Sequence, residues 1–161
     1  TNIATAVGEL LRSRNETVST VESCTSGALA SRLCSVSGAS DYFMGSIISY
    51  DNRIKVEQAG VNPDLIQHHG AVSQEVVEAM AVGGRERLKT DYAISTSGIA
   101  GPTGGTPDKP VGTVWIAVAT ESAVYSKRFQ FRHNRERNIE SAVVFAMNFL
   151  RRVILGMTTP S

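Results

Sequence analysis

The segment from Glu22 to Gly27 places hydroxyl and thiol side chains where a strand pattern gives way to a helix pattern. Residues 17–21 are rich in β-branched types, whereas residues 28–33 are typical of a helix. Backbone N–H groups at the start of a helix lack intrahelical partners, so they can hold a phosphate or a developing oxyanion. Ser23 is therefore a candidate nucleophile, although this segment alone favours a simple helix cap formed by Ser23 and Thr25.

A serine hydroxyl needs a base to act as a nucleophile at neutral pH, and Lys55 is the best candidate. Lys55 follows the end of a predicted strand closely enough for its amine and the phenol of Tyr50 to face one pocket. Burial or a neighbouring cation such as Arg53 would lower the pKa of this lysine and make it a competent base. An isolated lysine is more typical of a solvated helix surface. Surface roles are expected for the three histidines, at positions 68, 69 and 133.

The whole chain has the size and composition of one ordinary globular domain, residues 1–161. Its 16 Lys and Arg balance 15 Asp and Glu, and a net charge of +1 predicts neither nucleic-acid nor membrane binding. Cys24 and Cys34 are too few for a disulfide framework, and they show no metal-ligand spacing with the histidines. This cysteine usage favours a protein of the reducing cytoplasm. No signal peptide or membrane-spanning run is apparent, so we expect a soluble protein.

Helix and strand patterns alternate along the chain. We expect helices over residues 3–14, 28–33, 52–58, 63–69, 74–88 and 135–153, and strands over residues 17–21, 42–50, 91–97, 111–120 and 123–131. The last two strands are separated by two residues, which predicts an antiparallel hairpin.

This pattern predicts an α/β fold, a three-layer α/β/α sandwich around a mixed sheet. Ligands of such sheets gather at the loops that leave the strand ends. The turn at residues 22–27, the segment 49–52 and the glycine-rich loop 98–110 each follow a strand, and we expect them to share one rim. Taken alone, the glycine-rich loop is more typical of a tight connection.

Several separated motifs, in order and with similar spacing, resemble those of the CinA C-terminal domain family. They are Glu22-Ser23-Cys24-Thr25, Tyr50 through Lys55, Gly70-Ala71-Val72-Ser73, Ser97 through Pro102, and Lys109 through Trp115. The resemblance covers nearly the whole chain. It is more specific than any single glycine pattern.

The enzymatic members of this family are nicotinamide-nucleotide amidases. The resemblance therefore implies hydrolysis of the carboxamide of nicotinamide mononucleotide to nicotinate mononucleotide and ammonia, in recycling of the pyridine ring for NAD synthesis. By matching position, Ser23 is the implied nucleophile and Lys55 its base, with Tyr50 assisting proton transfer or orientation. No metal or cofactor is implied, the partner is a small nucleotide substrate, and a homodimer is a reasonable assembly.

The resemblance also implies a set of substrate-binding positions. Backbone donors at the turn after Ser23 would stabilise the oxyanion, the glycine-rich loop would approach the ribose phosphate or the ring, and an arginine near the last helix start would bind the phosphate. These positions are Cys24, Thr25, Gly27, Ser97, Gly98, Gly101, Arg135 and Arg137.

Three departures from the family pattern bear on this interpretation. Ser26 stands where the family usually has glycine, and we expect its side chain to intrude beside the oxyanion site. His133-Asn134 replaces a Gly-Asp pair, and Ile139 replaces a further arginine for which Arg137 is the candidate substitute. They leave open an inactive or altered-substrate paralogue that binds a pyridine nucleotide or phosphosugar. A Cys24 nucleophile is a weaker alternative, since small buried cysteines are common.

Overall fold

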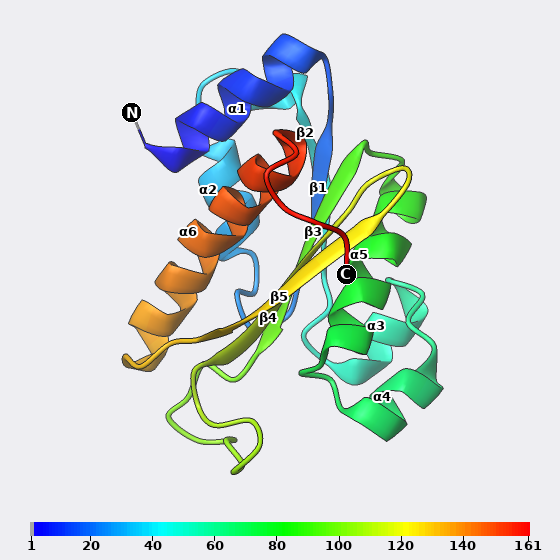
Figure 1. The fold of residues 1–161 in the computed structure, drawn as a ribbon, viewed down its shortest axis with the longest axis vertical. Coiled ribbons are helices and arrows are strands. Elements are labelled where there is room, and N and C mark those ends of the chain that lie inside the picture. Colours follow the sequence, from blue (N-terminus) through cyan, green and yellow to red (C-terminus); the bar gives the residue numbers. More distant parts are fainter. Residues whose placement is uncertain (1) are drawn as a thin grey trace.

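The computed structural model describes residues 2–161 (Figure 1). The helices are α1 (Ile3–Arg14), α2 (Ala28–Cys34), α3 (Asn52–Glu57), α4 (Pro63–His69), α5 (Gln74–Leu88) and α6 (Arg135–Ile154). The strands are β1 (Val18–Glu22), β2 (Phe43–Ile48), β3 (Tyr92–Gly98), β4 (Thr113–Ala119) and β5 (Val124–Gln130), and a 3-10 turn covers Ala39–Asp41. These elements match the expected order.

The five strands form one mixed sheet in the order β2-β1-β3-β4-β5. Strands β2, β1 and β3 are parallel, whereas β4 runs antiparallel to β3 and pairs with β5 in the predicted hairpin. Helices α1, α2 and α6 cover one face of the sheet, and α5 with the shorter α3 and α4 covers the other (Figure 1). The predicted three-layer α/β/α sandwich is therefore confirmed.

Alternating residues of the central strands supply the cores on the two faces, because successive side chains of a strand point to opposite sides. Val18 of β1 and Ile94 of β3 belong to the larger core, which α1, α2 and α6 complete. Val21 of β1 packs instead with Met80 of α5 in a second core. Every residue of β1 is buried, as expected for a strand covered on both faces.

Two glycines let α5 approach its neighbours closely. A Cβ added at Gly84 would lie 2.1 Å from Cγ2 of Val21, and one added at Gly83 would lie 1.7 Å from the carbonyl oxygen of Ala59. Neither distance is possible for a real side chain. The Gly83-Gly84 pair, which weakens the helix pattern in the sequence, therefore serves close packing of α5 against β1 and the chain after α3.

The carboxyl ends of β1, β2 and β3 meet at one edge of the sheet because these strands are parallel. The N–H of Ser49 donates to the carbonyl of Glu22 across 2.7 Å, and the N–H of Ser23 donates to that of Thr96 across 3.1 Å. These bonds join the three strand ends directly. The predicted common rim is formed.

The last helix, α6, is the longest, with 20 residues. It carries charged residues at both ends, and no helix within residues 2–161 is long and apolar enough to cross a membrane.

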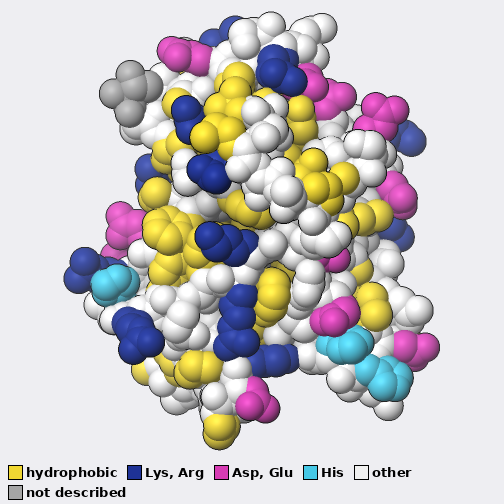
Figure 2. Space-filling view, in the orientation of Figure 1, with side chains coloured by type: hydrophobic (Ala, Val, Ile, Leu, Met, Phe, Trp, Pro, Cys, Tyr) yellow, Lys and Arg dark blue, Asp and Glu magenta, His cyan; other side chains and the backbone are white. Residues whose placement is uncertain are grey.

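Lys and Arg side chains gather over β5 in the view of Figure 2, which uses the orientation of Figure 1. Lys127 and Arg128 on β5 are both exposed, so local positive charge exists on a chain that is nearly neutral overall.

Candidate active site

Ser23 and Lys55 meet at the rim although 32 positions separate them in the chain. Ser23 directly follows β1, and Lys55 lies in the second half of α3, whose first turn is capped by the Asp51 side chain. The distance from Lys55 Nζ to Ser23 Oγ is 3.2 Å. The Lys55 residue is only 1% exposed, so this is a buried amine beside a serine hydroxyl. The contact is within the range that proton transfer requires.

Burial lowers the pKa of Lys55, because the charged ammonium loses hydration; nearby Asp51 and Cys24 oppose this effect. Lys55 Nζ also donates to the backbone carbonyl of Tyr50 across 3.0 Å. A carbonyl neighbour fixes the direction of the amine without supplying a full negative charge. The geometry and the pKa shift both suit a lysine that acts as a base.

The phenol of Tyr50 is hydrogen-bonded to Arg135 rather than to the Lys55 amine. Its hydroxyl faces Arg135, whose Nη2 donates to it across 3.3 Å, while Arg135 Nη1 donates to the carbonyl of Gly101 across 2.7 Å. Lys55 contacts Tyr50 through the backbone alone among the hydrogen bonds of residues 2–161. Tyr50 is 58% exposed, so its ring stands at the mouth of the site. Tyr50 and Lys55 line one pocket, as expected, but within residues 2–161 the phenol is hydrogen-bonded to Arg135 and not to the Lys55 amine.

A pocket of about 230 Å³ surrounds the pair. Its walls come from the three strand ends, α3, the segment before α5, and the start of α6. The lining residues are Ser23, Cys24, Tyr50, Asn52, Lys55, Ala71, Val72, Ser97, Gly98, Ala100 and Arg135. Seven of the eleven predicted site residues are in this set; Thr25, Gly27, Gly101 and Arg137 are not.

Thr25 and Gly27 are directed toward a buried carboxylate. Glu22 Oε1 accepts from Thr25 Oγ1 across 2.6 Å and from the N–H of Gly27 across 3.0 Å. The N–H groups of Leu29 and Ala30 are bound to the same carboxylate. The start of α2 is therefore capped by Glu22 rather than by Ser23 or Thr25, and Gly27 has no free N–H for an oxyanion.

The glycine-rich loop is anchored on both sides of the pocket. Ser97 Oγ donates to the carbonyl of Ala71 across 2.7 Å. The buried amide of Asn138 donates to the carbonyls of Ala100 and His133, and so ties the loop to the first turns of α6. These anchors hold the backbone after β3 against both walls.

Sequence reasoning missed four pocket residues and one that supports the pocket. Asn52, Ala71, Val72 and Ala100 line the pocket, and each lies within a motif already noted, so membership in those motifs was the available signal. The sequence also contained a signal for Asn138. It is a polar residue on the otherwise apolar face of the last helix, four positions before Ala142, and such a residue needs buried partners.

The departures from the family pattern lie outside the pocket. Ser26 is exposed, so the expected intrusion of its side chain is wrong, although its φ of 45° explains why glycine suits this position. Ile139 lines a separate hollow between α2 and α6. Asn134 caps α6 by accepting from the N–H of Arg137. None of these positions is among the residues that line the pocket around Ser23.

Cys24 lines the same pocket, and burial raises the pKa of its thiol to about 12. The reactive form of cysteine is the thiolate, which is therefore scarce near neutral pH. Cys24 is a poor nucleophile here, in contrast to Ser23 with its adjacent amine.

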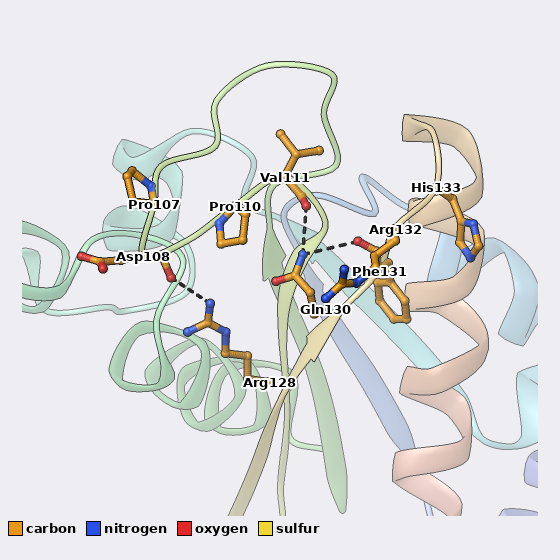
Figure 3. A pocket seen from close by; sticks show the side chains of 9 residues that line it. All are labelled: Pro107, Asp108, Pro110, Val111, Arg128, Gln130, Phe131, Arg132 and His133. Atoms are coloured by element: carbon orange, nitrogen blue, oxygen red, sulfur yellow. Dashed lines mark hydrogen bonds between the residues drawn. The ribbon is translucent and has the colours of Figure 1, made fainter.

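A larger hollow, of about 620 Å³, lies between the segment 107–111 and the residues at the end of β5 (Figure 3). Arg128 donates to the carbonyl of Asp108 across this hollow, and Gln130 donates to that of Val111. Its lining contains no nucleophile with an adjacent base. Within residues 2–161 no three His, Cys, Asp or Glu side chains are grouped as metal ligands would be. The smaller pocket, which holds Ser23 beside Lys55, is therefore the candidate active site.

Residues 1–154 match the family model of the CinA C-terminal domain. A CinA-like protein of Salinibacter ruber is 47% identical over 92% of this chain, and one of Cytophaga hutchinsonii is 46% identical over 91%. The matches cover only 36% and 35% of those two proteins. The chain thus corresponds to about a third of these relatives.

Solved structures share the fold closely. The competence/damage-inducible protein CihA of Agrobacterium tumefaciens superposes with a TM-score of 0.92 at 29% identity, over 94% of this chain and 93% of its own. A CinA superfamily protein of Klebsiella pneumoniae gives a TM-score of 0.92 at 31% identity, over 96% of both chains.

Proposed function

The chain belongs to the CinA C-terminal domain family, and we propose that it hydrolyses the carboxamide of nicotinamide mononucleotide, with Ser23 as nucleophile and Lys55 as base. The observation that carries this proposal is the 3.2 Å contact between Ser23 Oγ and the buried Lys55 Nζ, inside a pocket. The products are nicotinate mononucleotide and ammonia. The choice of substrate rests on the motif resemblance, and the choice of nucleophile and base rests on the contact between Ser23 and Lys55.

The first half of the reaction forms an acyl-enzyme. Ser23 donates its proton to the neutral Lys55 amine as Oγ bonds to the carboxamide carbon. The tetrahedral intermediate collapses when the C–N bond breaks, and the Lys55 ammonium returns the proton to the departing nitrogen as ammonia. In the second half, Lys55 takes a proton from water, which attacks the ester. Ser23 leaves with that proton, and the product is a carboxylate.

The turn after Ser23 supplies donors for the oxyanion. The N–H groups of Cys24 and Thr25 donate to no other residue in the described part of the chain. Backbone N–H groups next to a nucleophile are effective in this role because they are fixed before the reaction. Cys24 lines the pocket and Thr25 does not, so we assign the oxyanion to the Cys24 N–H, in place of Gly27.

We propose that Arg135 binds the phosphate. It lines the pocket, and its guanidinium is already oriented by Gly101 and Tyr50. An oriented guanidinium can still offer its remaining N–H groups to phosphate oxygens. The ring and carboxamide would then lie deeper, next to Ser23.

The test is release of ammonia and nicotinate mononucleotide from nicotinamide mononucleotide by the purified protein. Ser23→Ala and Lys55→Ala should each lower kcat by at least about 10³-fold. Lys127→Ala, which removes an exposed lysine from β5, is the matched control and should retain full activity. Binding measured by calorimetry without ammonia release would instead support a binding module. Full activity in Ser23→Ala or Lys55→Ala would refute the mechanism.

A further inference from the structure

Glu22 is a fully buried carboxylate directly before the proposed nucleophile. A buried carboxylate is costly unless hydrogen bonds satisfy its oxygens. Five donors do so here, namely Thr20 Oγ1, Thr25 Oγ1 and the N–H groups of Gly27, Leu29 and Ala30, at 2.6–3.0 Å. The carboxylate is thus compensated by the chain itself.

Three of these donors belong to the start of α2. Gly27 is the N-cap residue of that helix and has no side chain to cap it, and its φ of 101° is in the left-handed region. Glu22 supplies the missing acceptor from five residues upstream. The partial positive charge of the helix start stabilises the carboxylate in return. The chain between Glu22 and Gly27, which contains Ser23, is therefore closed into a loop fixed at both ends.

Two threonines extend the restraint to the neighbouring strands. Thr25 Oγ1 donates to Glu22 and is within 2.8 Å of Thr96 Oγ1 on β3. Thr20 Oγ1 donates to Glu22 and contacts Ser46 Oγ on β2. The carboxylate thereby joins α2 with the two strands that flank β1.

We propose that Glu22 is a positioning residue for the Ser23 nucleophile: its carboxylate fixes the turn so that Ser23 Oγ faces Lys55 and Cys24 lines the same pocket. The carboxylate has no direct hydrogen bond to Ser23 Oγ or Lys55 within residues 2–161, so it acts through the backbone of the turn. The inference rests on Ser23 being the nucleophile of the proposed function. It does not depend on which amide is the substrate.

The charge and both oxygens of Glu22 are required for this role. In Glu22→Gln the amide NH₂ replaces one acceptor, so a backbone N–H of α2 loses its partner while the side-chain volume is kept. We expect the turn to relax, and a displacement of about 1 Å at a nucleophile can lower a rate by about 100-fold. Substrate affinity should change little, because the remaining pocket walls are intact.

The experiment measures phosphonylation of Ser23 by a fluorophosphonate probe, followed by intact mass, so no natural substrate is needed. Glu22→Gln should lower the inactivation rate constant about 100-fold with little change in the probe binding constant, and Ser23→Ala should abolish labelling. Ser19→Ala is the matched control, since it removes a buried hydroxyl bonded to Thr90 at the other end of β1. It should lower the melting temperature but leave labelling unchanged.

Labelling of Glu22→Gln at the wild-type rate would overturn the proposal, as would equal slowing in Ser19→Ala. A crystal structure of Glu22→Gln with the Ser23–Lys55 contact unchanged would also overturn it. If Glu22→Gln does not fold, Thr25→Val removes one donor to the carboxylate and should slow labelling by a smaller factor; no slowing contradicts the proposal. Normal labelling of the wild type with no turnover of nicotinamide mononucleotide would refute the proposed substrate but not the role of Glu22.

Discussion

Tyr50 turns its phenolic oxygen toward Arg135, whose Nη2 donates to it across 3.3 Å, and offers its backbone carbonyl to the Lys55 amine. One residue thus contacts both ends of the pocket, through two different groups. The carbonyl orients the base, and the phenol orients the guanidinium. Substitutions of the side chain should therefore affect substrate binding rather than proton transfer.

Tyr50→Phe should leave kcat within about 3-fold of the wild type and raise KM, because Arg135 loses one of the two hydrogen bonds that orient its guanidinium.

Arg135→Gln should raise KM for nicotinamide mononucleotide by about 10- to 100-fold, since charged hydrogen bonds contribute about 1.5–3 kcal/mol. Steady-state kinetics with nicotinamide riboside, which lacks the phosphate, provide the control. A large fall in kcat for Tyr50→Phe would instead assign the phenol to proton transfer.

The activity should rise with pH through the pKa of Lys55, because only the neutral amine can accept the Ser23 proton. Burial lowers that pKa, so the rise should occur below the ordinary lysine value of about 10.4. The measurement is kcat/KM as a function of pH. A profile without this ascending limb would contradict a lysine base.

The lowered pKa of the Lys55 amine also makes the free energy of unfolding depend on pH. The unfolded chain binds the Lys55 proton up to about pH 10.4, whereas the folded protein releases it at lower pH, so wild-type stability should rise with pH between the two pKa values. Lys55→Met removes this contribution. The difference in unfolding free energy between Lys55→Met and the wild type should shift in favour of the wild type across that interval. Urea titrations at several pH values would show it, and a constant difference would argue against a lowered pKa.

Cys24→Ala should retain most of the activity, because the backbone N–H is kept and the thiol, with a pKa of about 12, is protonated. Iodoacetamide should modify the exposed Cys34 before the buried Cys24. Peptide mapping after alkylation gives the order. Loss of turnover in Cys24→Ala with activity kept in Ser23→Ala would reverse the assignment of the nucleophile.

Ser26→Gly should stabilise the protein by about 0.5 kcal/mol and leave kcat and KM unchanged. Relief of the left-handed backbone at Ser26 is worth about 1–2 kcal/mol, and the greater freedom of glycine in the unfolded chain offsets part of it. Ser31→Gly, the same change inside α2, should instead destabilise. Urea unfolding of both variants tests the opposite signs. A lower kcat in Ser26→Gly would mean that this side chain does act at the site.

Gly84→Ala should destabilise by about 1–3 kcal/mol, because the added methyl would overlap Val21 of β1. An alanine normally favours a helix over glycine, so propensity alone predicts the opposite sign. Ala79→Gly, in the same helix, should lower stability through propensity and lost contacts. A Gly84→Ala variant more stable than the wild type would show that α5 can move away from the sheet.

Much of the fold followed from local patterns. Helical periodicity and the short connection between β4 and β5 depend on neighbours within a few positions, and the helices and the hairpin that they predict are present. The nucleophile and base were also candidates by residue type and by their place after strand ends. The parallel arrangement then brought those ends to one rim.

Other relationships could be decided only by the tertiary structure. The strand order, the use of the Tyr50 carbonyl rather than its phenol, and the outward direction of Ser26 depend on register and rotamers that long-range packing selects. Glu22 is the clearest case. The sequence by itself places a carboxylate before Ser23, but the five donors that surround it come together only when β1 ends against α2 and its flanking strands, because hydrogen bonding depends on distance in space and not along the chain.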